Sequence, residues 1–160
     1  NHESPYRGET FVTKKVIKAL CRIKYRKQKK LILGNLYSKR DWGHAEDYVK
    51  AMWKMLQTKK PDDFVICTGK QYTIKYFINR VARLLKMKIV WRGKGINEKA
   101  FDHKNNCIIE CNKRYFRPAE VDTLKGDFSK ARRILKWKPE KDLDQLIKDM
   151  VSYEINLLSK

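Results

Sequence analysis

The stretch LGNLYSKRDWGHAEDYVKAMWKML, residues 33–56, determines how the chain is read. It closes a short apolar segment, Leu31–Leu33, with a Gly-Asn turn. A charged and aromatic cluster, Lys39–Trp42, follows, and apolar residues then recur at helical spacing from His44 to Gln57. A buried strand, a polar loop and an amphipathic helix in this order predict an α/β unit with functional side chains in the loop.

Further helices and strands are expected on both sides of this stretch. Helices are expected over residues 10–28, 44–57, 74–85 and 128–135, and strands over 31–33, 63–67, 88–91 and 107–110, with a loop over 92–106. Thr73 and Asp127 are expected to cap helices, and Asp142 with Gln145 matches a capping box for a last helix. The alternation of strands and helices predicts an α/β fold.

The composition fits one globular domain over residues 1–160. Of these residues 42% are hydrophobic, which is enough to build a buried core. No run of about 18 apolar residues is present, so no transmembrane helix is expected. The first residues lack the apolar segment of a signal peptide. Because the chain starts with Asn1 rather than methionine, we expect a piece of a longer, cytoplasmic protein.

The four cysteines do not form a metal-binding pattern. Cys21 and Cys67 lie inside apolar runs, where free cysteine commonly packs as a small hydrophobic residue. Cys107 and Cys111 are close in sequence, but His103 is the only further candidate ligand nearby, and a zinc site needs two such pairs. The sequence therefore predicts no metal site and a reduced protein.

Positive charge is the most unusual feature of the composition. Lysine and arginine number 38 against 18 acidic residues, which gives a formal net charge of +20. Such an excess is typical of nucleic-acid-binding proteins. However, lysine outnumbers arginine 27 to 11 and is spread along the chain, whereas proteins that read DNA bases rely on arginine forks. Nucleic-acid binding is therefore kept only as an alternative function.

Three polar clusters are not explained well by local structure. They are NHESPYRG at residues 1–8, the Arg40-Asp41-Trp42 triplet, and RYFRPAEVDTLKGD at residues 114–127. Taken singly, each is typical of a solvated loop or of the start of a helix. Taken together, arginines at loop ends of an α/β protein predict a pocket for an anionic ligand, because the guanidinium fork matches diphosphate oxygens.

The same clusters carry a family resemblance. NHESP-x-RG-x-x-FVT-x-K, LGNL-x-x-KRDWGHA-x-DYV-x-AMW-x-ML, P-x-DFVI-x-TG and RYFRP-x-EVD-x-L-x-GD resemble, in order and spacing, motifs of the GDP-mannose 4,6-dehydratases. That family belongs to the extended short-chain dehydrogenases/reductases. The resemblance covers essentially the whole chain. It implies the C-terminal portion of a Rossmann-like fold: a small, mixed helix-and-strand substrate-binding domain, some of whose elements pack on a missing N-terminal NADP-binding half.

The resemblance also implies a reaction. Such enzymes convert GDP-mannose to GDP-4-dehydro-6-deoxy-mannose and water, with bound NADP taking a hydride from the sugar and returning it in each turnover. The glycine-rich loop, the Tyr-x-x-x-Lys pair and the acid–base residues of the family would lie upstream of Asn1. We therefore expect no catalytic residue in this chain, and the chain alone should be inactive.

Binding roles follow from the resemblance residue by residue. His2 and Arg7 match positions that contact NADP near its nicotinamide end. Asn1 and Lys15 match contacts to the diphosphate region of the substrate. These four assignments place cofactor and substrate at the N-terminal end of the chain.

The GDP part of the substrate has its own matches. Arg40 and Arg117 resemble the clamps on this part, and Glu120 resembles a polar partner of the ribose hydroxyls. Asp41 and Trp42 are expected to brace the loop that carries Arg40.

The expected partners are GDP-mannose, an NADP-binding half or partner chain, and further copies of the intact enzyme in a homo-oligomer. Two alternative functions stay open: a catalytically inactive sugar-nucleotide-binding or interaction module, and a basic nucleic-acid-binding protein. Affinity for GDP-mannose that depends on Arg40 and Arg117 would exclude the last of these. DNA binding that ignores both arginines and collapses with salt would favour it.

Overall fold

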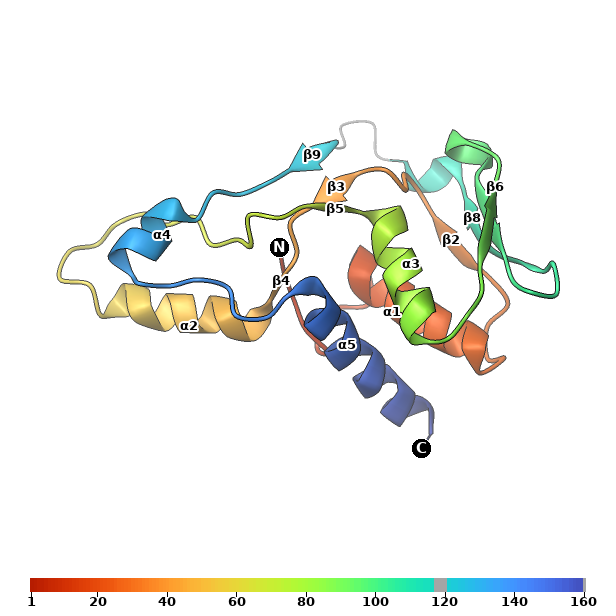
Figure 1. The fold of residues 1–160 in the computed structure, drawn as a ribbon, viewed down its shortest axis with the longest axis horizontal. Coiled ribbons are helices and arrows are strands. Elements are labelled where there is room, and N and C mark those ends of the chain that lie inside the picture. Colours follow the sequence, from red (N-terminus) through yellow and green to blue (C-terminus); the bar gives the residue numbers. More distant parts are fainter. Residues whose placement is uncertain (117–120, 160) are drawn as a thin grey trace.

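Three packed helices form the centre of the molecule. They are α1 (Val12–Lys24), α3 (Ile74–Leu84) and α5 (Leu143–Leu158), seen in a computed structural model that describes residues 1–116 and 121–159 (Figure 1). Apolar side chains recur at helical spacing on the facing sides of these helices, and Ile17, Ile78 and Met150 are fully buried between them. This cluster is the main hydrophobic core.

A mixed sheet extends this core beside α1 and α3. Its strand order is β2 (Leu31–Leu33), β8 (Cys107–Cys111), β7 (Lys99–Phe101) and β6 (Val90–Arg92). β2 runs parallel to β8, whereas β8, β7 and β6 are antiparallel neighbours. Ala100 and Ile109 pair across β7 and β8 and are fully buried, so this sheet closes one side of the core.

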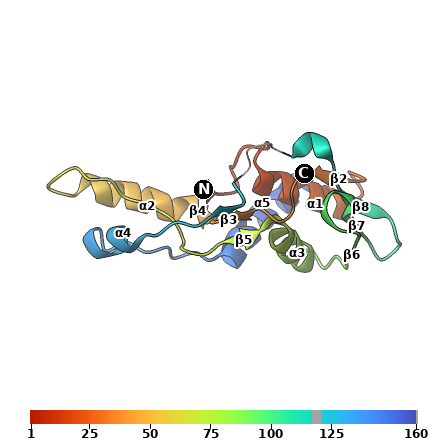
Figure 2. The ribbon, with the colours of Figure 1, turned by 90° about the horizontal axis from the view of Figure 1, so that it is seen from above.

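Short strands bring distant loops together. β1 (His2–Glu3) pairs in parallel with β4 (Gly43–His44). β3 (Lys39–Arg40) lies between β5 (Tyr72–Thr73), to which it is antiparallel, and β9 (Thr123–Leu124), to which it is parallel. The single-turn helices η1 (Gly95–Asn97) and η2 (Lys113–Tyr115) complete the connections. The N-terminal strand, the loop around Arg40 and β9 therefore meet at one place (Figures 1 and 2).

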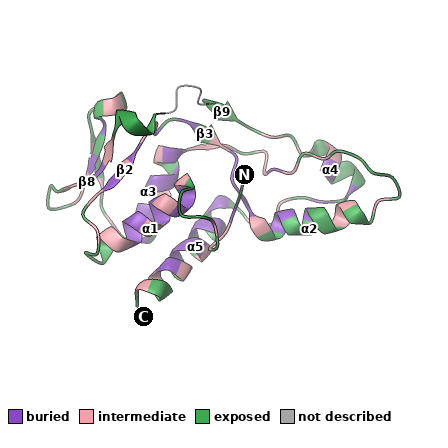
Figure 3. Cartoon of the chain, turned by 180° about the vertical axis from the view of Figure 1, so that it is seen from behind, coloured by how far each residue is buried: buried purple, intermediate pink, exposed green. Residues whose placement is uncertain are grey.

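α2 (Ala45–Leu56) and α4 (Ser129–Ile134) form a separate layer that extends away from the three central helices (Figures 1 and 2). A small second core lies between them, made of Ala51, Ala131, Leu135 and Trp137. The rest of the predicted apolar face of α2 is uncovered: Val49, Met52, Trp53 and Leu56 are 53–82% exposed (Figure 3). An amphipathic helix has thus formed with most of its apolar side facing outward.

The predicted helices are confirmed, with shorter ends in several cases. α1 ends at Lys24 because Arg26 adopts a left-handed φ of 57° and the backbone N–H of Lys27 closes the turn on the carbonyl of Arg22. Thr73 caps α3, and Asp142 forms the predicted capping box with Gln145. At α4 the N-cap is Phe128 rather than Asp127, although the Asp127 carboxylate accepts a hydrogen bond from the Ser129 N–H.

Three strand predictions need correction. Residues 63–67 form no strand in the structure, since an apolar segment needs a neighbouring backbone to form a ladder. The segment 92–106, predicted as loop, contains η1 and β7, whose three residues are too few to show a periodicity. The strand predicted at 88–91 lies at Val90–Arg92 instead, in the register set by its pairing with β7.

Three further properties of the described residues concern membrane spanning, metal binding and thiol chemistry. No helix among residues 1–116 and 121–159 combines the length and apolar character needed to cross a bilayer. In the same ranges no three acidic, cysteine or histidine side chains lie close enough to hold a metal ion. All four cysteines are free thiols, and burial raises the pKa of Cys21 to about 12, which keeps that thiol unreactive.

Candidate functional site

A pocket of about 570 Å³ opens where the N-terminus, the start of α1, the end of β2, the loop around Arg40 and η2 meet. Its polar lining consists mainly of Asn1, Glu3, Arg7, Thr10, Lys15, Asn35, Arg40 and Arg114. The pocket thus brings together four of the residues singled out from the sequence: Asn1, Arg7, Lys15 and Arg40. Arg117 and Glu120 lie outside the described residues.

A buried carboxylate fixes the N-terminal segment at the pocket. Glu3 is 3% exposed, accepts a 2.5 Å hydrogen bond from the Thr13 hydroxyl, and lies 3.1 Å from the Nε of Arg7. Burial raises the pKa of Glu3, although the bond from Thr13 and the charge of Arg7 oppose this shift. The Arg7 guanidinium also lies 3.4 Å from the centre of the Phe11 ring. Arg7 is therefore held in one direction at the pocket edge.

Lys15 is a partly buried cation in the wall of the pocket. Its ammonium lies 4.2 Å from the centre of the Tyr115 ring, and burial lowers its pKa. Among residues 1–116 and 121–159, no acidic side chain forms an ion pair with Lys15. A desolvated cation with no anion beside it is unfavourable. An anionic ligand in the pocket would relieve this cost.

Arg40 enters the pocket from β3. Its Nη1 donates hydrogen bonds to the carbonyl oxygens of Lys39, at 2.8 Å, and of Val121, at 2.6 Å. Because β3 is also paired with β5 and β9, both the backbone and the side chain of Arg40 are tied to neighbouring segments. The guanidinium is thus oriented by the loop network rather than by a regular helix.

Asp41 and Trp42 brace this loop, as the sequence predicted. Asp41 is 4% exposed, and its carboxylate accepts hydrogen bonds from the N–H and the hydroxyl of Thr68, at 2.9 and 2.6 Å, and from the N–H of Gly69, at 2.9 Å. Trp42 is 3% exposed and packs on Phe77, with ring centres 5.2 Å apart. Asp41 is buried outside the pocket lining, whereas the buried Trp42 also forms part of the pocket wall.

His2 lies apart from the other predicted residues. It is exposed on β1, is not part of the pocket lining, and has its ring centre 5.5 Å from that of Tyr48. Partial desolvation and the nearby charge of Arg7 lower its pKa, which favours the neutral imidazole. His2 therefore lies outside the pocket that contains Asn1, Arg7, Lys15 and Arg40.

Sequence reasoning missed Asn35 and Tyr115 as lining residues. Their placement depends on Gly34, where an added Cβ would lie only 2.1 Å from the carbonyl oxygen of Tyr115. Only glycine allows the end of β2 and η2 to approach so closely. The sequence indicates a turn at Gly34-Asn35, but it does not show that this turn approaches the backbone of Tyr115.

Comparison with known proteins shows which family this chain resembles. A family model described as GDP-mannose 4,6 dehydratase matches residues 1–150. The chain is 44% identical to a GDP-mannose 4,6 dehydratase of Drosophila melanogaster and 48% identical to GDP-mannose 4,6 dehydratase 1 of Arabidopsis thaliana, in both cases over its full length. It spans only 41% and 40% of the length of these two relatives.

Solved structures agree on the fold. RMD from Pseudomonas aeruginosa, in complex with NADPH, matches 98% of the chain with a TM-score of 0.78 and 19% identity, and the match spans 46% of that protein. The dTDP-glucose 4,6-dehydratase of Bacillus anthracis, in complex with NAD, matches 96% of the chain with a TM-score of 0.72 and 17% identity, over 41% of that protein. The mixed α/β chain therefore has the fold of less than half of an extended short-chain dehydrogenase, as the sequence predicted.

Proposed function

The chain belongs to the GDP-mannose 4,6-dehydratase family, and we propose that it is the substrate-binding part of an enzyme that converts GDP-mannose to GDP-4-dehydro-6-deoxy-mannose and water. The observation that carries this proposal is the environment of Lys15. This cation is partly desolvated, lies over Tyr115 and shares its pocket with Arg40. A nucleotide diphosphate would supply a negative charge beside Lys15.

Each pocket residue has a role in this proposal. Asn1 and Lys15 contact the diphosphate region, and Arg40 clamps the GDP part. Arg117 and Glu120 complete the nucleotide site, an assignment that rests on the sequence motif alone. Lysine acts as a point charge and arginine as a directed fork, so together they would fix both the position and the orientation of the diphosphate.

NADP is the proposed cofactor, with His2 and Arg7 as its contacts from this chain. Arg7 lines the N-terminal edge of the pocket and is oriented by Glu3, while His2 lies outside the lining on the adjoining strand β1, an arrangement that fits a dinucleotide extending out of the pocket. When bound, NADP would supply the acceptor and donor of the hydride. This chain would contribute by anchoring the diphosphate, so that the hexose is held in one position against the cofactor.

The exposed face of α2 is the proposed contact with the nucleotide-binding part of the enzyme. Val49, Met52, Trp53 and Leu56 form a continuous apolar stripe of 53–82% exposed side chains, and Val65 in the next segment is 57% exposed. Exposed apolar surface of this extent is typical of an interface. Because relatives are more than twice as long as this chain, a nucleotide-binding part of the relatives' kind is the occupant we propose.

Reconstitution tests the activity. The chain would be mixed with the nucleotide-binding part of the Arabidopsis relative, NADP and GDP-mannose, and the 4-dehydro product measured. We expect product only when both parts are present, and much less with Arg40→Ala than with the control Arg133→Ala, which removes an exposed arginine of α4. Binding of GDP-mannose without turnover in the reconstituted pair would instead favour an inactive binding module.

A further inference from the structure

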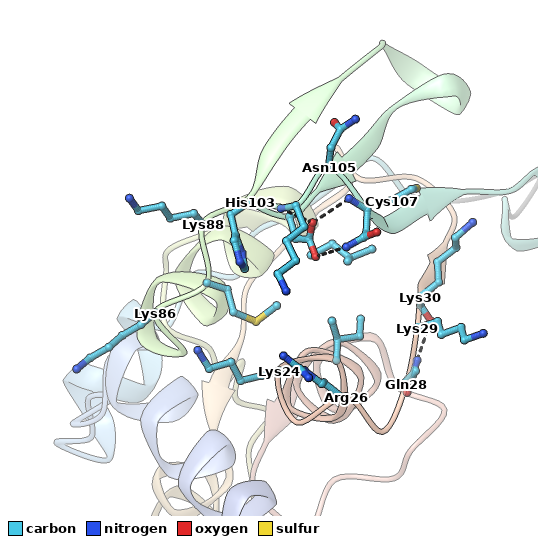
Figure 4. A pocket seen from close by; sticks show the side chains of 16 residues that line it. Lys24, Arg26, Gln28, Lys29, Lys30, Lys86, Lys88, His103, Asn105 and Cys107 are labelled. Carbon is cyan, nitrogen blue, oxygen red and sulfur yellow. Dashed lines mark hydrogen bonds between the residues drawn. The ribbon is translucent and has the colours of Figure 1, made fainter.

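A second and larger hollow, of about 1280 Å³, lies at the other end of α1 from the candidate site. Segments from three separate parts of the chain line it: residues 23–30 at the end of α1, residues 86–88 after α3, and residues 102–108 around the turn between β7 and β8 (Figure 4). Neither the family assignment nor the proposed function uses this hollow.

The hollow is lined mainly by cations. They are Lys24, Arg26, Lys29, Lys30, Lys86, Lys88 and Lys104, and His103 lies beside them. The one acidic residue of the lining, Asp102, accepts hydrogen bonds from the N–H groups of Lys104 and Asn106 and from the Asn106 side-chain amide. Lys30 forms an ion pair with Glu110 at 2.8 Å. Within residues 1–116 and 121–159, the other lysines and Arg26 have no carboxylate partner.

Helix ends explain only part of this cluster. α1 and α3 both end at the hollow, and cations near helix C-termini are favoured by the helix dipole, which accounts for Lys24 and Lys86. It does not account for Lys104, which belongs to a β-turn, or for Lys29, which lies several residues beyond α1. Bringing like charges from three segments to one hollow is unfavourable unless an anion lies between them.

The chemistry of the lining indicates the class of anion. Lysine ammonium groups are point charges that suit phosphate groups. The lining contains no Phe, Tyr or Trp, so it lacks the stacking surface with which proteins hold single-stranded nucleic acid. Ile23, Met87 and Ile108 add an apolar part to a concave site. A compact ligand fits this shape better than an extended polymer does.

We propose that this hollow is a binding site for a compact anion with several phosphate groups, such as inorganic tripolyphosphate or a nucleoside triphosphate. Both ligands share a phosphate chain, and exposed lysines of all three segments border the hollow that would hold it. Tighter binding of the nucleoside triphosphate would show that the apolar part of the hollow holds the base and sugar. Equal binding would show that the phosphates alone are recognised.

Calorimetric titration of the 160-residue chain with tripolyphosphate and with ATP, without Mg²⁺, tests the proposal. The decisive variant is the triple substitution Lys24→Gln, Lys86→Gln and Lys104→Gln, which removes one exposed lysine from each lining segment. The matched control changes three exposed lysines far from the hollow, namely Lys59→Gln, Lys60→Gln and Lys138→Gln. Both triple variants lose the same formal charge, so general attraction of anions to the chain is held constant.

We expect the hollow variant to lose at least about tenfold in affinity and the control to change by less than about twofold, with binding that weakens between about 50 and 200 mM salt. Equal losses in both variants would overturn the proposal, because diffuse charge would then explain the binding. Absence of binding by the unsubstituted chain at the lower salt concentration would overturn it as well. So would a short single-stranded RNA that binds more tightly and depends on the same three lysines. Circular dichroism of both variants would confirm that they fold.

Discussion

Replacing Asp41 with alanine should both destabilise the protein and weaken its ligand site. The Asp41 carboxylate accepts three hydrogen bonds of 2.6–2.9 Å from Thr68 and Gly69, and Asp41 itself is 4% exposed. Its loss removes the acceptor of the Thr68 and Gly69 N–H groups and of the more distant Gly126 N–H at 3.5 Å, while the Thr68 hydroxyl can turn to its other acceptor, the carbonyl of Lys70 at 3.2 Å. The N–H groups therefore dominate the cost.

The magnitude follows from these contacts. An unsatisfied buried donor costs about 1–3 kcal/mol, so two such donors give about 2–6 kcal/mol for Asp41→Ala. This is a large part of the roughly 5–15 kcal/mol by which a domain is usually stable. The variant Thr68→Val removes one side-chain donor and keeps both backbone bonds, so it should cost only about 1 kcal/mol. Asp41→Asn keeps one acceptor oxygen and should fall between the two.

Urea unfolding followed by circular dichroism measures these differences, with the slope of the transition checked for constancy. The folded fraction of Asp41→Ala should also bind GDP-mannose at least about tenfold more weakly, since about 1.4 kcal/mol lost in the orientation of Arg40 gives that factor. An Asp41→Ala variant as stable as Thr68→Val would refute the bracing argument. Normal GDP-mannose affinity in a clearly destabilised Asp41→Ala variant would refute the link from Asp41 to Arg40.

Three other perturbations test the close approach at Gly34, the charge of Lys15 and the exposed face of α2. Gly34→Ala should lower both the melting temperature and GDP-mannose affinity, because its Cβ would lie 2.1 Å from the Tyr115 carbonyl oxygen; an unchanged melting temperature would contradict the close approach. Burial lowers the pKa of Lys15 from 10.5, so its desolvation penalty is present at neutral pH and disappears as pH rises through the lowered value. GDP-mannose affinity should therefore fall as pH rises toward 10.5. The Lys15→Arg variant keeps its charge and should resist this fall. It is titrated in parallel because guanine also loses a proton in base, which changes the ligand itself. Trp53→Lys, at a 62% exposed position, should change the stability of the isolated chain by no more than about 0.5 kcal/mol yet prevent reconstitution with the nucleotide-binding part; reconstitution at the normal rate would exclude α2 from that interface.

Features encoded in neighbouring residues were predictable from the sequence. The caps at Thr73 and Asp142 depend on side chains that reach only three residues along the chain, and both are confirmed. Strands β2 and β8 were also recognised, since each is a short apolar run. The two-residue strands were not, because a pair of residues carries no periodicity. Their existence depends on pairing between loops that lie far apart in the sequence.

The segment 63–67 shows a second reason why a structural prediction from the sequence failed. Its apolar pattern is that of a buried strand, yet it forms none, and Val65 is 57% exposed. Together with the exposed face of α2, this pattern predicts burial that the described structure does not supply. The proposed contact with a nucleotide-binding part would account for both observations.

The candidate site was only partly predictable for a similar reason. Family motifs indicated Asn1, Arg7, Lys15 and Arg40, which do line one pocket, whereas Tyr115 enters it only through the close approach at Gly34. The basic run at residues 24–30 follows α1, where the helix dipole alone favours cations. Only the tertiary structure brings it together with lysines of two other segments.

The most direct test of the central claim is the affinity of the 160-residue chain for GDP-mannose, measured by calorimetric titration with and without Lys15. We predict saturable binding that falls at least about tenfold in Lys15→Gln, since removal of a charged partner from a diphosphate costs about 1.4 kcal/mol or more. Lys18→Gln, on the same helix but paired with Glu9 at the surface, should bind normally. Equal affinity in the two variants, or no binding by the unsubstituted chain, would contradict the account.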